Sequence, residues 1–543
     1  MIKYYNHLLI YYTLFIISIT SSNAQINTNN IEIIRDNYGV PHIFSKTDAE
    51  LAYGLAWAHA EDDFETIQKA YLAGNNLLSK LLGIKGAGAD FLTQFIGSDE
   101  LINDLYESKI STEYKKILEA YSQGINRFAE LNPDKVLIKE LFPLNPKKLL
   151  KYAQLQLFVS SEGDYWINKI IKNDLKYQVV DQSNNLYSNE ETRGSNVFGF
   201  NSSRTKDGNT YLAINTHQPL DGPVSWYEAH LSSEEGTNIL GALFAGSPHV
   251  LIGANENIAW SHTVNRPDKT DVFALEMHPK FKNKYRVDDN YYDLEEYKAS
   301  IFIKILGIPI KIKRKYYKSI YGPTLKNNSG YYSIRTPSLF EIRAMEQWWR
   351  MGKAKNFTEF YNIIKKNSLP GYNIGYADKN DTIFYISNGL IPKRKDGYDW
   401  KNVVPGNTKK TLWTEMYKTE ELPQVIQPKS GYFYNANHSP FLSTSKNENP
   451  KKGSFSKNMG FETYDNNRST RLYKLIEEKK ELDYNDFKKI KYDNYLPNPL
   501  SYSWMDINAL FDINPNKYPE ISNILIQIQK WDRKTDTDSY GAG

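Results

Sequence analysis

Arg193-Gly194-Ser195-Asn196 marks the point where the pattern of this sequence changes. The residues before it, 173–193, are polar and poor in apolar side chains, which is typical of a solvated loop. The residues after it, 196–215, predict a hairpin whose turn holds an Asp-Gly pair. Ser195 therefore stands directly after a loop and at the start of a strand.

A Gly-Ser-Asn tripeptide alone usually marks a turn, so the interpretation of Ser195 depends on the segments that accompany it. They are RDNYGVPHI at 35–43, AWAHAEDD at 56–63, NTHQP at 215–219, the block 241–264 that ends in AWSHTV, and YNANHSP at 434–440. In order and spacing, these segments resemble the penicillin acylase family of N-terminal-nucleophile amidohydrolases. The resemblance covers most of the chain after residue 30.

The resemblance implies an α+β fold, the four-layer αββα sandwich of N-terminal-nucleophile hydrolases with added helical segments. It also implies that one precursor is cut into an α/β heterodimer. We expect a largely helical α chain over 25–170, an excised spacer over 171–194, and a β chain over 195–543 that begins with the nucleophile. WDRKTDTDSYGAG at 531–543 resembles a motif that family members carry well before their C-termini, so we also expect the β chain to be truncated.

Cleavage between Gly194 and Ser195 would supply the base that a serine nucleophile needs. A serine hydroxyl reacts poorly until a base removes its proton. A free α-amine, with a pKa of about 7.7–8.0, can take that proton directly or through one water. Gly194 suits the scissile position because glycine admits strained backbone geometry. The sequence has no Gly-x-Ser-x-Gly elbow, which argues against an α/β-hydrolase.

Further site residues follow from the resemblance. The backbone N–H of Val264 and the side-chain amide of Asn437 would donate to the oxyanion that forms when an amide carbonyl is attacked. Arg468, in NNRSTR at 466–471, would support Asn437. Arg471 is close enough in sequence to exchange roles with Arg468.

His217 bears on the substrate. Penicillin-specific family members commonly carry glutamine at the matching position, whereas members that resemble acyl-homoserine-lactone, aculeacin and cephalosporin acylases carry histidine. Its implied role is to orient the Ser195 amine through a hydrogen bond. The resemblance thus implies a hydrolase of linear amides that acts on a small N-acyl compound, such as an acyl-homoserine lactone, a lipopeptide or a β-lactam.

The sequence assigns no metal and no other cofactor. Asp268 and Asp271 resemble calcium ligands of some family members, but their companion glutamate is not identifiable. The nine histidines are scattered singly, which disfavours a zinc or calcium hydrolase. The acidic run at 61–63 is interpreted as a helix terminus.

Composition and the N-terminus indicate an exported protein. Residues 1–24 have a positive Lys3, an apolar run at 8–19 and a small-residue cleavage site, which is typical of a signal peptide. The apolar run is short for a membrane span, which needs about 20 residues. The net charge of +4 argues against a nucleic-acid surface, and the absence of cysteine excludes disulfides and a cysteine nucleophile. We expect a periplasmic or secreted protein without a stable membrane span.

A non-catalytic envelope protein that keeps the fold and binds ligands in an aromatic cleft is the alternative hypothesis. Such a protein would be expected to lose Ser195, Asn437 or the small residue at 194, and all three are present.

Periodicity predicts the elements around these motifs. We expect a strand over 31–35, a helix from Thr47 or Asp48, and helices through 99–170. Strands are expected at 238–244, 250–253 and 271–276, with an antiparallel section over 285–335. GIKGAG at 83–88 is predicted to be a helix-ending turn.

Overall fold

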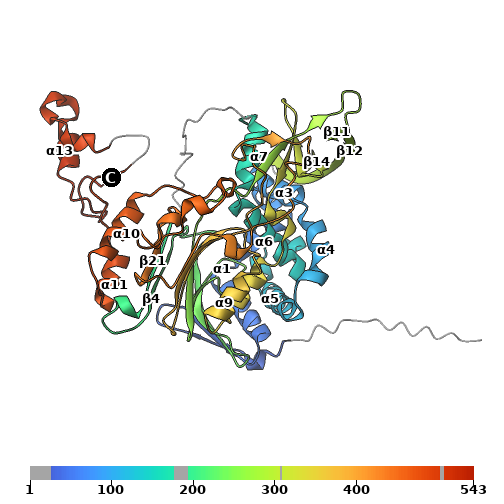
Figure 1. The fold of residues 1–543 in the computed structure, drawn as a ribbon. Helices are drawn as coiled ribbons and strands as arrows, with labels where there is room; N and C mark the ends of the chain where they lie inside the picture. The colour runs from blue at the N-terminus through green and yellow to red at the C-terminus, as the bar shows by residue number, and fades with distance from the viewer. Residues whose placement is uncertain (1–25, 177–193, 306–307, 502–506, 543) are drawn as a thin grey trace, which may run out of the picture.

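The computed structural model describes residues 26–176, 194–305, 308–501 and 507–542 (Figure 1). The predicted signal peptide at 1–24 and residues 177–193 of the predicted spacer lie outside these ranges. Within them, no helix is both long and apolar enough to cross a membrane.

A large sheet forms the centre of the fold. In the described part of the chain it has nine strands, in the order β1-β2-β5-β6-β7-β8-β17-β18-β20. Neighbouring strands are antiparallel except for β2 and β5, which are parallel. The strands are Glu32–Arg35, Pro41–Ser45, Tyr227–Ser233, Asn238–Leu243, Ile252–Asn255, Ile258–Thr263, Tyr372–Asp378, Ile383–Asn388 and Gln424–Ile426.

A small sheet packs face to face on the large one. Its central strand β3 (Ser195–Phe200) pairs antiparallel with β21 (Tyr432–Asn435) and β4 (Tyr211–Thr216). Val197 of β3 joins residues of β17, β18, β20 and β21 in a buried cluster between the sheets. Phe198 and Phe200 belong to a different cluster, because successive side chains of a strand point to opposite faces.

Helices cover the outer faces of both sheets. Phe198 and Phe200 pack against α10 (Asn467–Glu477) and α11 (Tyr484–Lys491). On the outer face of the large sheet, one extended core joins its strands to a layer of helices that includes the four named next. They are α1 (Asp48–Gly74), α5 (Thr112–Leu131), α8 (Ala344–Met351) and α9 (Phe357–Ile364). The layers therefore follow the order αββα, which confirms the predicted fold class.

Helix α1 begins where the sequence predicts. The Thr47 side chain accepts a hydrogen bond from Glu50 N, and the Glu50 carboxylate accepts one from Thr47 N, at 2.9 Å. This reciprocal capping box satisfies two N–H groups that the first turn of a helix leaves unpaired. The predicted helices of 99–170 are α4 (Ser98–Lys109), α5, α6 (Pro146–Ser160) and α7 (Gly163–Lys172).

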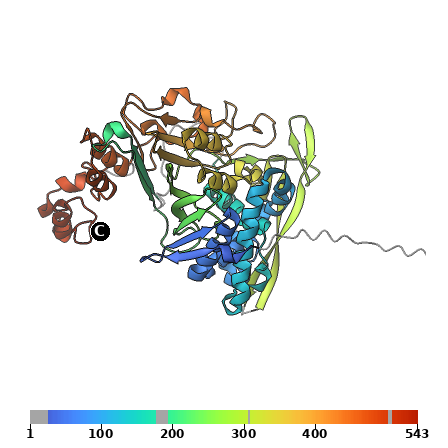
Figure 2. The ribbon, with the colours of Figure 1, turned by 90° about the horizontal axis from the view of Figure 1, so that it is seen from below.

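The predicted antiparallel section forms two further sheets. One contains β13 (Glu295–Ile305), β14 (Ile308–Ser319), β15 (Gly322–Lys326), β16 (Tyr331–Arg335), β9 (Asp271–Ala274) and β19 (Val404–Pro405). The other contains β10 (Glu276–Met277), β11 (Lys284–Val287) and β12 (Asn290–Asp293). The long β13–β14 hairpin runs beside the N-terminal helices, where β13 contacts α3 (Figure 2).

The predicted helix-ending turn at GIKGAG is only partly right. Of the GIKGAG cluster, only Gly83, with φ +60°, is a break; it separates α2 (Leu78–Leu82) from α3 (Ile84–Phe95). Gly86 lies inside α3, where a Cβ would come within 2.5 Å of the Leu78 backbone, so close packing explains this glycine. The predicted helical region of 99–170 ends with α7 at Lys172.

Candidate active site

Ser195 is the first residue of β3 and lies fully buried, with 0% of its surface exposed. It pairs with Thr216 of β4 across the small sheet. Its Oγ donates a hydrogen bond of 2.6 Å to the carbonyl oxygen of Gly194. The hydroxyl thus lies next to the peptide bond that the sequence predicts to be cleaved.

Gly194 is enclosed by polar groups. Its carbonyl oxygen also accepts from the backbone N–H of His217, at 3.1 Å. A Cβ at residue 194 would lie 2.8 Å from Nη2 of Arg468. A side chain at residue 194 would therefore displace the Arg468 guanidinium from its present position.

Asn437 follows β21 and contacts the same peptide bond through its side chain. Its Oδ1 accepts from Ser195 N at 2.5 Å and from Arg468 Nη2 at 2.9 Å, and its Nδ2 donates to Val264 O at 2.9 Å. Its φ of +62° lies in the left-handed region, which asparagine tolerates better than most residues. Asn437 is therefore both a turn residue and a site residue.

Arg468, and not Arg471, lies at the site. Both belong to α10, but Arg468 Nη1 donates to Ser195 O at 3.0 Å and to Asn196 Oδ1 at 2.7 Å. Arg471 instead forms a bidentate pair with Asp493, at 2.9 and 2.6 Å. Of the two arginines that the sequence left open, Arg468 is therefore the one that contacts Asn437.

His217 contacts the candidate site through its backbone N–H, which donates to Gly194 O. Its side chain is exposed, directly after β4. Desolvation lowers the pKa of the imidazole, and the positive charges of Arg468 and Lys491 act in the same direction. A neutral ring is the form that could accept a hydrogen bond from an amine.

Val264 directly follows β8, and a buried polar network holds it beside Asn437. Asn373 Nδ2 donates to Val264 O at 3.3 Å, to Thr263 Oγ1 at 3.0 Å and to Asn435 Oδ1 at 3.2 Å. Asn435 Oδ1 also accepts from Asn437 N at 2.9 Å. Sequence reasoning missed Asn373 and Asn435, although Asn435 lies inside the YNANHSP motif.

His262 supports this region as a neutral imidazole. It precedes Thr263 on β8, and its Nε2 accepts from Trp348 Nε1 at 2.8 Å. Burial lowers its pKa to about 4. Protonation of Nε2 would remove the acceptor for the Trp348 indole.

We expect His262 to make the fold sensitive to acid. The pKa of His262 is lower in the folded protein than its value of about 6.5 in the unfolded chain. The stability that neutral His262 gives the fold is therefore complete above pH 6.5 and is lost as the pH falls toward 4. Because of this residue, the free energy of unfolding should change by at most about 1.4 kcal/mol per pH unit. The free energy of unfolding in urea should differ less between pH 7 and pH 5 for His262→Gln than for the unmodified protein. Glutamine can accept the hydrogen bond from Trp348 without titrating. An equal difference in both proteins would contradict this prediction.

An aromatic pair lies near the candidate nucleophile. Trp226 Nε1 donates to the carbonyl oxygen of Thr216 at 3.0 Å, and Thr216 is the strand partner of Ser195. The Trp226 ring stacks on Phe244, with centroids 4.4 Å apart. These rings offer an apolar surface beside the site.

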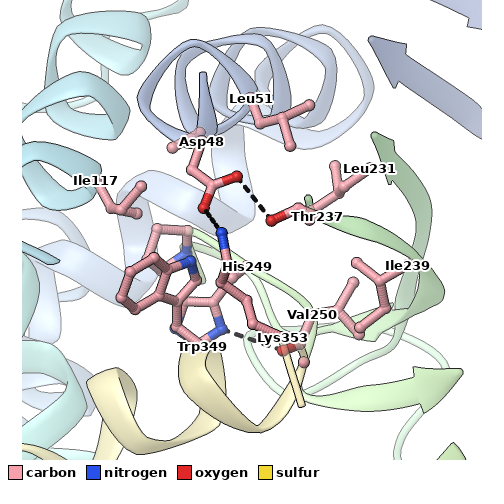
Figure 3. A pocket seen from close by; sticks show the side chains of 13 residues that line it. Asp48, Leu51, Ile117, Leu231, Thr237, Ile239, His249, Val250, Trp349 and Lys353 are labelled. Atoms are coloured by element: carbon pink, nitrogen blue, oxygen red, sulfur yellow. Dashed lines mark hydrogen bonds and ion pairs between the residues drawn. The ribbon is translucent and has the colours of Figure 1, made fainter. Parts of the chain in front are cut away.

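A small pocket lies elsewhere, between the helices and the large sheet (Figure 3). Its volume is about 30 Å³. Asp48 on its wall pairs with Lys353 and accepts from Thr237 Oγ1 at 2.7 Å. The large sheet lies between this helical layer and the small sheet that carries Ser195, so the pocket is not part of the candidate active site.

The two aspartates that resemble calcium ligands of some family members hold an arginine. Asp271 Oδ2 accepts from Arg394 Nε at 2.9 Å, and Asp268 Oδ1 accepts from Arg394 Nη2 at 3.2 Å. The described ranges contain no group of three or more histidine or acidic side chains placed to hold a metal ion. A guanidinium between the two carboxylates does not fit a calcium site at this position.

Comparison with known proteins identifies the family of the chain. The family model described as penicillin amidase matches residues 30–543. This chain belongs to the penicillin amidase family. The assignment confirms the resemblance that the motifs around Ser195 indicated.

Relatives within the penicillin amidase family share little sequence identity with the chain. An acyl-homoserine lactone acylase PvdQ of Pseudomonas fluorescens is 23% identical over 66% of this chain and 50% of its own length. Penicillin G acylase of Escherichia coli is 22% identical over 77% of this chain and 60% of its own. The chain thus spans about half the length of the first of these relatives.

A solved structure supports the same fold. The thermostable penicillin G acylase from Alcaligenes faecalis, in its orthorhombic form, matches 64% of this chain and 60% of its own with a TM-score of 0.51. At 20% sequence identity, this likeness concerns the fold alone.

Proposed function

We propose that this protein is a self-processing N-acyl amide hydrolase whose nucleophile is Ser195, freed as an N-terminal residue. The observation that carries the proposal is the set of contacts around one peptide bond. Ser195 Oγ lies 2.6 Å from Gly194 O, while Asn437 and Arg468 hold the nitrogen and carbonyl sides of Ser195. His217 donates its backbone N–H to Gly194 O.

In the proposed maturation step, Ser195 Oγ attacks the carbonyl carbon of Gly194. The C–N bond breaks, the nitrogen of Ser195 takes the hydroxyl proton, and Gly194 becomes joined to Oγ as an ester. Water then hydrolyses the ester, which leaves a carboxylate on Gly194 and a free hydroxyl and α-amine on Ser195. The His217 N–H is placed to stabilise the negative charge that develops on Gly194 O.

In the proposed turnover, the Ser195 α-amine accepts the Oγ proton as the hydroxyl attacks the substrate amide. The amine returns this proton to the leaving nitrogen, and water later releases the acyl group from Oγ. Val264 N–H and Asn437 Nδ2 would donate to the oxyanion. Asn437 Oδ1, which accepts from Ser195 N in the uncut chain, would accept from the amine after cleavage.

The intact mass of the complete gene product tests the proposal. We expect two polypeptides, the larger beginning at Ser195, in a periplasmic or secreted α/β heterodimer that needs no coenzyme. A protein that remains uncut and binds N-acyl compounds without turnover would favour the alternative, a binding protein that keeps the acylase fold.

We expect aliphatic acyl amides to be preferred over phenylacetyl amides. Histidine at 217 and the acyl-homoserine lactone acylase among the relatives support this ranking, and the Trp226–Phe244 pair offers an apolar surface to either acyl group. The measurement is kcat/KM for a decanoyl and a phenylacetyl amide with the same leaving group. A higher value for the phenylacetyl amide would reverse the predicted ranking.

A further inference from the structure

Arg394 is a fully buried cation that joins three segments of the chain. Its side chain is 0% exposed. Besides the two carboxylates, its Nη1 donates to the carbonyl oxygens of Asp268 and Asn458, each at 2.8 Å. Asp271 in turn accepts from Trp413 Nε1 at 2.6 Å. The guanidinium therefore faces four oxygen atoms, two from carboxylates and two from the backbone.

Carboxylate and backbone oxygens of this kind would otherwise suit a hard divalent cation. Ca²⁺ takes six to eight oxygen ligands at about 2.3–2.6 Å. Here the same oxygens lie 2.8–3.2 Å from nitrogen atoms of a planar fork, which is hydrogen-bonding geometry. The space between Asp268 and Asp271 is filled by a positive charge that belongs to the chain.

The segment that Arg394 anchors leads directly to Val264. Residues 264–268 connect β8 to Asp268, and the following contacts tie this loop to Asn388 and to the segment 459–462. Asn265 Nδ2 donates to Asn388 O at 2.9 Å, the backbone N–H of Arg266 donates to Glu462, and Asp268 N donates to Met459 O at 3.1 Å. Arg394 holds the far end of the loop.

We propose that Arg394 is a fixed internal cation that occupies the position of a divalent metal between Asp268 and Asp271. It anchors the 264–268 loop, so the fold needs no calcium at this place. The proposal concerns the uncut chain and does not depend on the catalytic function proposed above. It also predicts that removal of the guanidinium turns the two aspartates into a cation-binding pair.

Thermal unfolding of the Ser195→Ala chain, kept as one polypeptide, provides the test. With Arg394 present, Tm should be the same in EDTA and in millimolar CaCl₂. Arg394→Ala should lower Tm by about 5 °C, because it removes the cation that both buried carboxylates contact directly. CaCl₂ should then recover part of the loss, whereas NaCl at the same ionic strength should not.

Two results would overturn the proposal. One is a Tm of the Arg394-containing chain that falls in EDTA and returns with CaCl₂. The other is an Arg394→Ala chain whose Tm is unchanged. If Arg394→Ala does not fold, the neutral triple variant Arg394→Met with Asp268→Asn and Asp271→Asn decides the matter. Folding of that variant supports charge compensation, and its failure to fold contradicts it.

Discussion

Ser195→Ala is expected to remain one polypeptide and to have no measurable amidase activity. In the uncut chain, Ser195 Oγ is the hydroxyl that lies 2.6 Å from Gly194 O, so its removal leaves the scissile bond without its nucleophile. The same change removes the group that would attack the substrate. Loss of the nucleophile typically lowers hydrolase rates by about 10⁶-fold. A denaturing gel and intact mass report cleavage, and release of a chromogenic leaving group reports turnover.

The control for this experiment is another buried serine. Ser333 lies on β16, is also 0% exposed, and bonds Ser319 and Thr324 far from β3. Ser333→Ala should be cut and active like the unmodified protein. Cleavage of Ser195→Ala at the 194–195 bond, or cleavage of the unmodified protein at a different bond, would show that Ser195 is not the self-processing nucleophile.

The sequence predicted the elements that depend on local patterns. The start of α1 at Thr47 or Asp48 and the strand that begins beside Ser195 follow from residues close together in the chain. The layered fold was predicted from the order and spacing of the motifs that resemble the penicillin acylase family, and the structure confirms it. The error at Gly86 has a physical cause, because glycine serves close contact between two helices as well as turns.

The long-range contacts of the site could not be predicted in the same way. Asn373 reaches Val264 because β17 pairs with β8, and no local pattern distinguishes this buried asparagine from one in a turn. Arg468 and Arg471 are separated only by the position of Asp493, which binds Arg471. The sequence pattern around Asp268 likewise contains nothing that indicates Arg394.

Asn437 variants are expected to separate a loss of turnover from a loss of stability. Asn437→Asp keeps Oδ1, the acceptor for Ser195 N and Arg468, and loses the N–H donor. We expect it to be cleaved and folded, with kcat lowered about 10²–10³-fold, which corresponds to about 2.7–4 kcal/mol. KM should change little, because the donor acts chiefly once charge develops on the oxygen.

Two further substitutions isolate the contribution of the turn. Asn437→Ala should lower both kcat and Tm, because alanine lacks the polar side chain that helps asparagine to adopt the left-handed region, at φ +62°, where most residues lose about 1–2 kcal/mol. Asn437→Gly should recover the Tm, because glycine adopts this φ freely, and should not recover kcat. Tm and kcat are to be measured on the same cleaved preparation. If Asn437→Gly turned over substrate at the normal rate, Asn437 would be a turn residue alone, and the oxyanion would have to be stabilised by other donors.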